Sequence, residues 1–219
     1  AQAYHTMGDG EAMQLMMQRC LHAQPGFVPA LESMASYLSS QKNLEGSLYY
    51  AKQLLTHDPA NFTANFSLGL HHQVNGERKL AKDAYVWCLK RNVTSPVLNN
   101  LAWLEQEMGN IDEAIDLSRQ ALAANPNDRS AWDTLGYSLL KAGEYDEGTE
   151  ALFKALEIDP QHLNVNLHIL ELFLVQNKED SASMLVDKLE DRLDEMSSAQ
   201  VSLFEELRSR FNEMTEADG

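Results

Sequence analysis

The chain has 219 residues, 44% of them hydrophobic, and its 17 basic and 33 acidic residues give a net charge of −16. A chain of this length can bury a substantial core, and no stretch approaches the ~20 consecutive apolar residues of a membrane-spanning helix, so direct membrane insertion is not expected. The acidic balance argues against nucleic acid and anionic membrane surfaces as partners, because both are negatively charged.

Glycine and proline recur along the chain at an interval close to 34 residues. The glycines are Gly8, Gly76, Gly109 and Gly143, and the prolines are Pro25, Pro59, Pro126 and Pro160. Successive members are separated by 33 or 34 residues, or by about twice that number where one repeat lacks the residue. An interval of this length indicates an array of stacked helix–turn–helix repeats. Such arrays present extended surfaces to other chains, which favours binding over catalysis.

On this interval the chain divides into seven segments. Residues 1–27, which include Tyr4 and Gly8, are expected to be the second half of a truncated repeat whose first helix is missing. Helix pairs are expected in 28–61, 62–94, 95–128 and 129–162, a degenerate pair in 163–196, and a C-terminal capping helix with a tail in 197–219. The turns within the five pairs are expected at 42–43, 76–77, 109–110, 143–144 and 177–178.

Local signals place the ends of these helices. Glycine at the fifteenth position of a repeat, such as Gly143, ends the first helix because glycine enters the left-handed conformation with little strain. The residue before a proline is pushed out of the helical region, so Asp58 and Asp159 are expected to end second helices. Ser197 is expected to begin the last helix, with Gln200 completing a capping box.

The repeat at 129–162 carries the clearest motif. It reads Trp132-x-x-Leu135-Gly136, followed by Gly143, Leu152, Ala155 and Pro160. These residues resemble the tetratricopeptide repeat family, although Leu139 stands where the family has tyrosine and Gly148 where it has alanine. The resemblance implies an all-α fold, a right-handed superhelical solenoid of antiparallel helix pairs with Trp132 in its core. Small residues at the eighth position are expected to let paired helices approach closely: Ala35, Gly69, Ala102 and Gly136.

The resemblance also implies a concave groove lined by the first helices of successive repeats. The inward positions that it assigns here form the expected peptide-binding site: Phe66, Leu70, Asn99, Asn100, Trp103, Gln106, Asp133 and Tyr137. Trp103 is the expected anchor, because buried aromatic residues dominate binding energies at interfaces. The alternative is that Trp103 only packs on a neighbouring first helix.

The residue types that carry chemistry do not form a recognisable site. Cys20 and Cys88 fall at a small-residue packing position and are expected to be structural thiols. His71 and His72 point roughly 100° apart on a helix, so we expect a surface pair and not a metal site. A solvated face of one helix is expected to hold Asp187, Glu190, Asp191, Asp194 and Glu195. We therefore expect no catalytic residues, no cofactor and no metal, and no enzyme activity.

The segment near the N-terminus is rich in methionine. Met13 and Met17 fall at core positions of the truncated repeat, so packing is their expected role. The helix that would cover this face is missing from the chain, and methionine is common at adaptable binding surfaces. Self-association through the truncated N-terminal end is therefore a further expectation.

The expected function is that of a protein–protein interaction scaffold. It would bind a peptide or helix of a partner in the concave groove, with no nucleic acid ligand, as part of a larger bacterial assembly or export protein. The motifs at 98–103 and 132–137 are loosely similar to those of bacterial envelope and exopolysaccharide-system repeat proteins, which favours the periplasm or envelope over the cytoplasm. The alternative is a non-catalytic recruiting or regulatory segment of a larger enzyme, such as a glycosyltransferase or a protease adaptor.

The net charge of −16 predicts that moderate salt stabilises the fold. Like charges repel one another in the compact state, and salt screens that repulsion. The melting temperature should rise between low and physiological ionic strength, as followed by circular dichroism. A melting temperature that falls over this range would mean that favourable ion pairs outweigh the repulsion.

Overall fold

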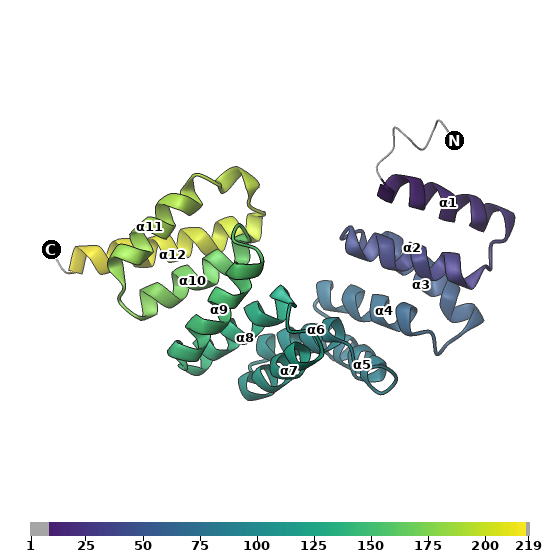
Figure 1. Cartoon of the computed structure of the whole chain (residues 1–219), viewed down its shortest axis with the longest axis horizontal. Helices are drawn as coiled ribbons and strands as arrows, with labels where there is room; N and C mark the ends of the chain where they lie inside the picture. The colour runs from purple at the N-terminus through teal and green to yellow at the C-terminus, as the bar shows by residue number, and fades with distance from the viewer. Residues whose placement is uncertain (1–8, 218–219) are drawn as a thin grey trace. The chain divides into compact units, whose positions relative to one another are not determined.

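The computed structural model describes residues 9–217, so Tyr4 and Gly8 lie outside the described residues. The chain forms two compact units, Ala1–Val97 (unit 1) and Leu98–Gly219 (unit 2). Every regular element between residues 9 and 217 is a helix, and no strand occurs among them (Figure 1).

The helices follow one another in pairs. Unit 1 contains α1 (Asp9–Ala23), α2 (Val28–Ser40), α3 (Leu44–His57), α4 (Phe62–Val74), α5 (Arg78–Leu89) and the start of α6 (Ser95–Glu107). Unit 2 continues α6 and contains α7 (Ile111–Ala124), α8 (Arg129–Ala142), α9 (Tyr145–Ile158), α10 (Leu163–Val175), α11 (Glu179–Glu190), the short 3₁₀ helix η2 (Leu193–Glu195) and α12 (Ser198–Ala217). The expected all-α array of helix pairs is confirmed, and each of the five expected turns separates two helices.

The turns inside the pairs share one backbone conformation. Gly76, Gly109 and Gly143 have φ of 73°, 82° and 82°, the left-handed region that glycine enters with little strain. Two repeats place other residues there, Lys42 with φ of 59° and Asn177 with φ of 52°. The turn geometry is therefore kept even where the glycine is absent.

Asp58 and Asp159, the residues before the closing prolines, are extended, both with φ of −143°, and each ends a helix as expected. The first turn of the following helix is capped by a side chain in several repeats. The Asp128 carboxylate, for example, accepts hydrogen bonds from the backbone N–H groups of Ser130 and Ala131, at 3.0 and 3.2 Å.

Close approach of paired helices depends on the small residue at the eighth position. A Cβ atom added to Gly69 would lie 2.5 Å from Cε1 of Tyr85. At Gly136 an added Cβ would lie 2.6 Å from Cγ of Leu152 and 2.9 Å from its backbone nitrogen. Neither contact is sterically possible without movement, so α4 packs on α5, and α8 on α9, at distances that only glycine permits.

The last helix covers the end of unit 2. Phe204 and Leu207 of α12 are fully buried and pack in one cluster with Leu167, Leu170 and Leu174 of α10. The expected capping box is present. The backbone N–H of Ser197 donates to Oε1 of Gln200 at 2.9 Å, and that of Gln200 donates to the Ser197 hydroxyl at 3.4 Å. The capping helix therefore closes the apolar core of the last pair.

Three sequence expectations are wrong in detail. Trp132 is only half-buried, because it packs at the edge of the core and donates from Nε1 to the Pro126 carbonyl at 2.8 Å. Met17 is buried as expected, but Met13 is 48% exposed. The five expected carboxylates are all exposed, yet they do not share one helix, since α11 ends at Glu190 and the last two lie in η2.

The two cysteines and the histidine pair carry no ligand set. Cys20 and Cys88 are both free, and burial raises the pKa of the Cys88 thiol to about 11. His71 and His72 are half-buried and not the surface pair that the sequence predicts. His71 shares a hydrogen bond of 2.8 Å with the Asn75 amide. Within residues 9–217 no group of three or more His, Cys, Asp or Glu side chains is placed to hold a metal ion.

Gly136→Ala should destabilise the chain by about 1–3 kcal/mol, because the new methyl group overlaps the side chain and backbone of Leu152. This loss should exceed the gain of about 1 kcal/mol in helix propensity. Gly143→Ala is the comparison variant: nothing lies within 4 Å of its added Cβ, but its left-handed φ of 82° should still cost alanine about 1–2 kcal/mol, so it reports backbone strain without steric overlap. Denaturant unfolding measures both variants, and a Gly136→Ala variant as stable as the parent would contradict the packing argument.

Candidate functional site

The eight residues expected to line a groove fall into two groups, one in each unit. Phe66 and Leu70 belong to unit 1, and the other six belong to unit 2. Phe66 and Leu70 border a hollow in unit 1, and Trp103, Gln106 and Tyr137 border a hollow in unit 2.

The hollow in unit 1, here named the Phe66 hollow, has a volume of about 650 Å³. Its apolar lining comes from Phe66, Leu70 and Val74 of α4 and from Leu44 at the start of α3. The Phe66 ring is half-buried, with its centroid 6.0 Å from that of Tyr85, so its position is fixed by the helix behind it. Serine hydroxyls of α2 and the Lys42 side chain complete the wall. This hollow suits an apolar side chain flanked by polar groups.

The hollow in unit 2, here named the Trp103 hollow, has a volume of about 410 Å³. Trp103 of α6 is 37% exposed beside it and is not one of the residues of the apolar core. The rest of the lining comes from α6, α7 and α8, namely Gln106, Glu107, Ile111, Tyr137 and Lys141. Three of the expected residues, Trp103, Gln106 and Tyr137, are therefore brought together.

Tyr137 is held rigidly at this hollow. Its ring stacks on the imidazole of His168, with centroids 4.0 Å apart and planes 12° from parallel. The Lys141 ammonium lies 4.7 Å from the centre of the same ring, a cation–π arrangement. Burial raises the pKa of the Tyr137 hydroxyl above its usual value, and its hydrogen bonds with Lys141 and Glu171 shift that pKa in opposite directions.

A charged pair supports Lys141 from the next repeat. Its ammonium donates to Oε1 of Glu171 at 2.8 Å, and the Glu171 side chain is only 11% exposed. Burial lowers the pKa of Lys141, but its contacts with Glu171 and Tyr137 outweigh that effect and raise it overall. Lys141 is therefore a fixed positive charge at the edge of the Trp103 hollow.

Other expected site residues are engaged inside the protein. Asp133 accepts from Nδ1 of His168 at 2.7 Å, and its side chain is only 13% exposed. The Gln106 side-chain oxygen accepts from the Ser138 hydroxyl at 2.8 Å, which leaves its amide N–H groups for a ligand. Asn99 and Asn100 are half-buried, and Oδ1 of Asn99 is buried without a hydrogen-bond partner.

The structure adds Lys141, Glu107 and Ile111 to the expected residues. Lys141 and Glu107 both stand at the thirteenth position of their repeats, so their shared repeat position was a signal that could have found them. Ile111 begins a second helix, and its part in the hollow follows only from the packing of α7 beside α6.

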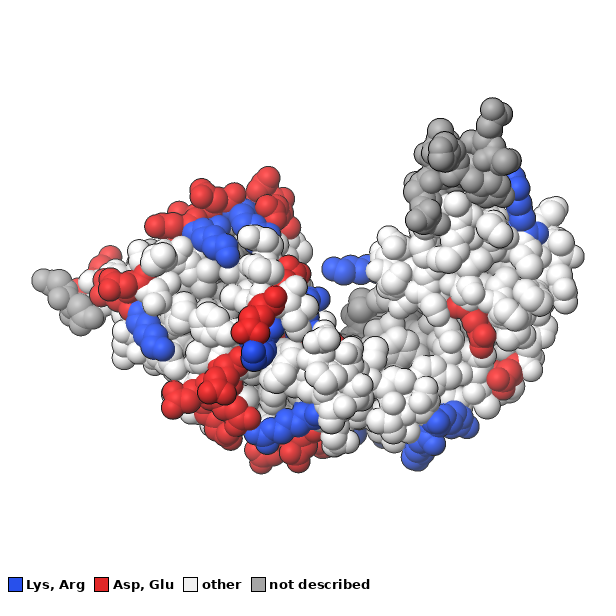
Figure 2. Space-filling model, in the orientation of Figure 1, with Lys and Arg blue, Asp and Glu red and all other residues white. Residues whose placement is uncertain are grey.

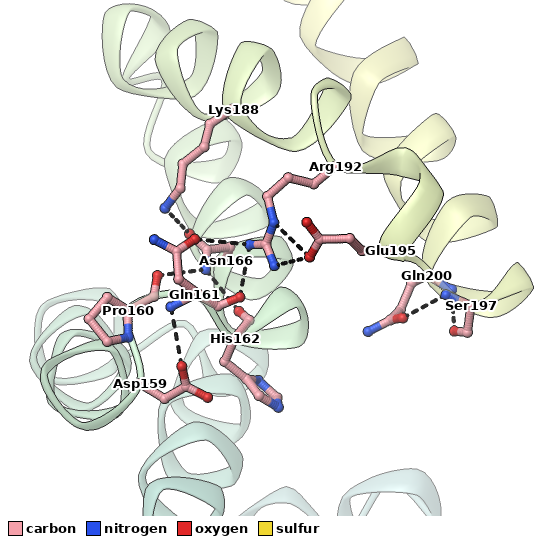
Figure 3. Close-up of polar contacts among 10 residues, drawn as sticks. All are labelled: Asp159, Pro160, Gln161, His162, Asn166, Lys188, Arg192, Glu195, Ser197 and Gln200. Carbon is pink, nitrogen blue, oxygen red and sulfur yellow. Dashed lines mark hydrogen bonds and ion pairs between the residues drawn. The ribbon is translucent and has the colours of Figure 1, made fainter.

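A polar cluster at the far end of unit 2 serves the fold (Figure 3). Arg192 donates to the Gln161 backbone carbonyl at 2.8 Å and to the Glu195 carboxylate at 2.6 Å. It thereby fixes η2 against the turn between α9 and α10. Burial lowers the pKa of the neighbouring His162, whose Nδ1 is buried without a hydrogen-bond partner. These contacts are local and structural.

No helix between residues 9 and 217 is both long enough and apolar enough to cross a membrane.

A family model described as "Tetratricopeptide repeat" matches residues 99–162. The small glutamine-rich tetratricopeptide repeat-containing protein 2 of Mycosarcoma maydis is 34% identical over 104 residues, which are 47% of this chain and 28% of that protein. The human protein O-mannosyl-transferase TMTC3 is 22% identical over 194 residues, which are 80% of this chain and 21% of that protein. The chain thus spans between a fifth and a third of the length of these relatives.

Solved structures show the same fold. PilW, described as a widely conserved type IV pilus biogenesis factor, matches with a TM-score of 0.69 at 14% identity, covering 89% of this chain and 91% of PilW. YrrB, described as a TPR protein with an unusual peptide-binding site, matches with a TM-score of 0.59 at 20% identity, covering 88% of this chain and 97% of YrrB. Together with the helix pairs and the left-handed turns, these comparisons show that residues 99–162 match the tetratricopeptide repeat and that the chain shares the fold of tetratricopeptide repeat proteins.

Proposed function

We propose that this chain is a protein-interaction scaffold that captures a peptide or helix of a partner through apolar anchors. The observation that carries the proposal is the Trp103 hollow, where a partly exposed tryptophan lies outside the core beside a rigid tyrosine and a fixed lysine. Large aromatic side chains around a concave site supply most of the binding energy at interfaces of this kind.

The polar groups around the hollow suit a peptide backbone. The amide N–H groups of Gln106 remain available, because only its side-chain oxygen is bonded, to the Ser138 hydroxyl. Groups like these can pair with a carbonyl that would otherwise lose its hydrogen bonds to water on binding. The stacking of Tyr137 on His168 fixes its ring in the unbound protein, so less conformational entropy is lost on binding.

The Phe66 hollow extends the proposal to unit 1. It offers a second apolar recess, with hydroxyl groups from Ser36, Ser39 and Ser40 along its wall. An apolar side chain of a bound peptide would be buried in this recess.

We further propose that the scaffold works inside a larger bacterial assembly or export protein, in the periplasm or envelope. The support is the fold shared with PilW, which is described as a pilus biogenesis factor. The motifs at 98–103 and 132–137 favour the same context.

The alternative is a recruiting segment of a larger enzyme. The observation that favours it is the alignment of 80% of this chain with part of a human protein O-mannosyl-transferase. The groove would then hold a substrate or adaptor near a catalytic domain elsewhere in the protein. The flanking sequence of the full-length gene separates the two proposals, because it would contain either a transferase domain or envelope-targeting and assembly segments.

Trp103→Ala should weaken peptide binding by about 2–4 kcal/mol, a rise in Kd of about 30-fold to 1,000-fold, and leave the fold intact. The probes are synthetic peptides chosen from a random peptide library displayed on phage against this chain. Fluorescence anisotropy measures their Kd, and circular dichroism checks the fold.

Tyr145→Ala is the matched control for this measurement. Tyr145 is an aromatic residue of unit 2 with the same 37% exposure as Trp103, but it lies outside the Trp103 hollow. Its removal should leave the Kd of the selected peptides unchanged. If Trp103→Ala binds as tightly as the parent, the proposed groove is wrong.

A further inference from the structure

A second apolar surface lies elsewhere in unit 2, between α9 and α11. Residues of α9, α10 and α11 enclose a groove of about 330 Å³, here named the outer groove. Its apolar lining is Phe153, Leu156, Ile169, Phe173, Met184 and Leu185. Phe153 is 44% exposed and Met184 is 75% exposed, so two large apolar side chains project into water on opposite walls of the groove. An exposed apolar pair beside a recess is typical of an interaction site.

The outer groove and the residues that support the Trp103 hollow use different sides of α10. Ile169 and Phe173 form part of the outer groove, whereas His168 and Glu171 support Tyr137 and Lys141. At 100° per residue, these two pairs of α10 positions point roughly 150° apart. A ligand in one site therefore does not occupy the other.

Charge is distributed very unevenly between the two units. Residues 98–219 contain 26 acidic and 9 basic residues, a net charge of −17, whereas residues 1–97 contain 7 acidic and 8 basic residues, a net charge of +1. Figure 2 shows the acidic side chains of the visible face gathered over the helices of unit 2. The net negative charge of the chain therefore comes entirely from unit 2, which contains the outer groove.

Carboxylates flank both walls of the outer groove. Glu150 lies one turn before Phe153 on α9, and Asp180 and Asp187 lie one turn to either side of Met184 on α11. All three are exposed, and none forms an ion pair within the described part of the chain. Two lysines lie nearby. Lys154 pairs with Glu157 at 2.8 Å, whereas Lys188 lines the groove, donates to the neutral Asn166 amide at 3.2 Å and keeps its positive charge.

We propose that the outer groove binds a basic amphipathic helix of a partner protein. The walls are helices of 14 and 12 residues, about 18–21 Å long, which matches a bound helix of about 12–14 residues. Apolar side chains at i, i+3, i+4 and i+7 of that helix would pack against Phe153, Ile169 and Met184. Lysine or arginine on either side of the stripe would pair with Glu150, Asp180 and Asp187, which complements the charge of the unit.

The net charge of unit 2 also argues against a second copy of this chain as the ligand of the outer groove. A second unit 2 would bring another −17 charges to the same surface, and like charges across an interface are unfavourable. A basic partner instead relieves the repulsion within the unit. The surface therefore selects for a cationic helix.

The test uses the whole chain and a synthetic probe. The probe is a fluorescein-labelled helical peptide of 14 residues, with leucine at i, i+3, i+4 and i+7 and lysine or arginine at most other positions. Its Kd is measured by fluorescence anisotropy at several salt concentrations. Phe153→Ser and Met184→Ser should each raise the Kd at least tenfold. Asp180→Asn with Asp187→Asn should raise it several-fold and reduce its dependence on salt, because two charge pairs are lost.

Two controls decide the outcome. Asp194→Asn removes an exposed carboxylate of unit 2 away from the groove, so it should leave the Kd nearly unchanged. A peptide of the same composition with its leucines scrambled should bind at least tenfold more weakly. Equal binding of the scrambled peptide, or of the Phe153→Ser and Met184→Ser variants, would overturn the proposal and show charge attraction alone. A concentration-dependent dimer in sedimentation velocity that Met184→Ser disrupts would also overturn it, in favour of self-association.

Discussion

The rest of the structure depends on one steric constraint, the contact between the small eighth residue of a repeat and the helix that pairs with it. Ala35 and Ala102 are completely buried, and at Gly136 there is no room for even a methyl group beside Leu152. This contact sets the spacing of each helix pair, and the left-handed turn sets its direction. Stacked pairs of one geometry bring the same positions of successive first helices to neighbouring places. The Trp103 hollow exists because α6 and α8 present such positions side by side.

Much of the fold could be predicted from the sequence because the signals are local and repeated. Gly143, Asp159 and the Ser197–Gln200 capping box each fix a helix end by backbone chemistry that needs no tertiary information. The expected positions of Trp132 and Met13 are wrong because burial depends on which helices stack nearby. The 34-residue interval alone places Trp132 at a core position. In the structure its indole N–H donates a hydrogen bond to the Pro126 carbonyl at the edge of the core.

Less of the candidate site than of the fold could be predicted from the sequence, because the site depends on contacts between side chains of different repeats. Trp103 and Tyr137 could be assigned to an inward surface from their repeat positions, and both border the same hollow. Asp133 was expected at that surface as well, but its carboxylate is used by His168, one repeat further on. Lys141 was not predicted as a site residue, although its charge and its position in the repeat can be seen in the sequence. Pairings between side chains about 30 residues apart, such as Lys141 with Glu171, depend on rotamers that a periodic pattern does not encode.

The two proposed surfaces of unit 2 meet at α10, and this placement limits how they can influence each other. Val165, Leu170 and Leu172 of that helix are completely buried, so α10 is fixed on several sides by the core. Allosteric coupling between the surfaces would require a second arrangement of α10 that both ligands bias. Cooperation between the surfaces would instead come from a partner that occupies both. Such a partner gains from effective concentration, because its second contact becomes intramolecular once the first has formed.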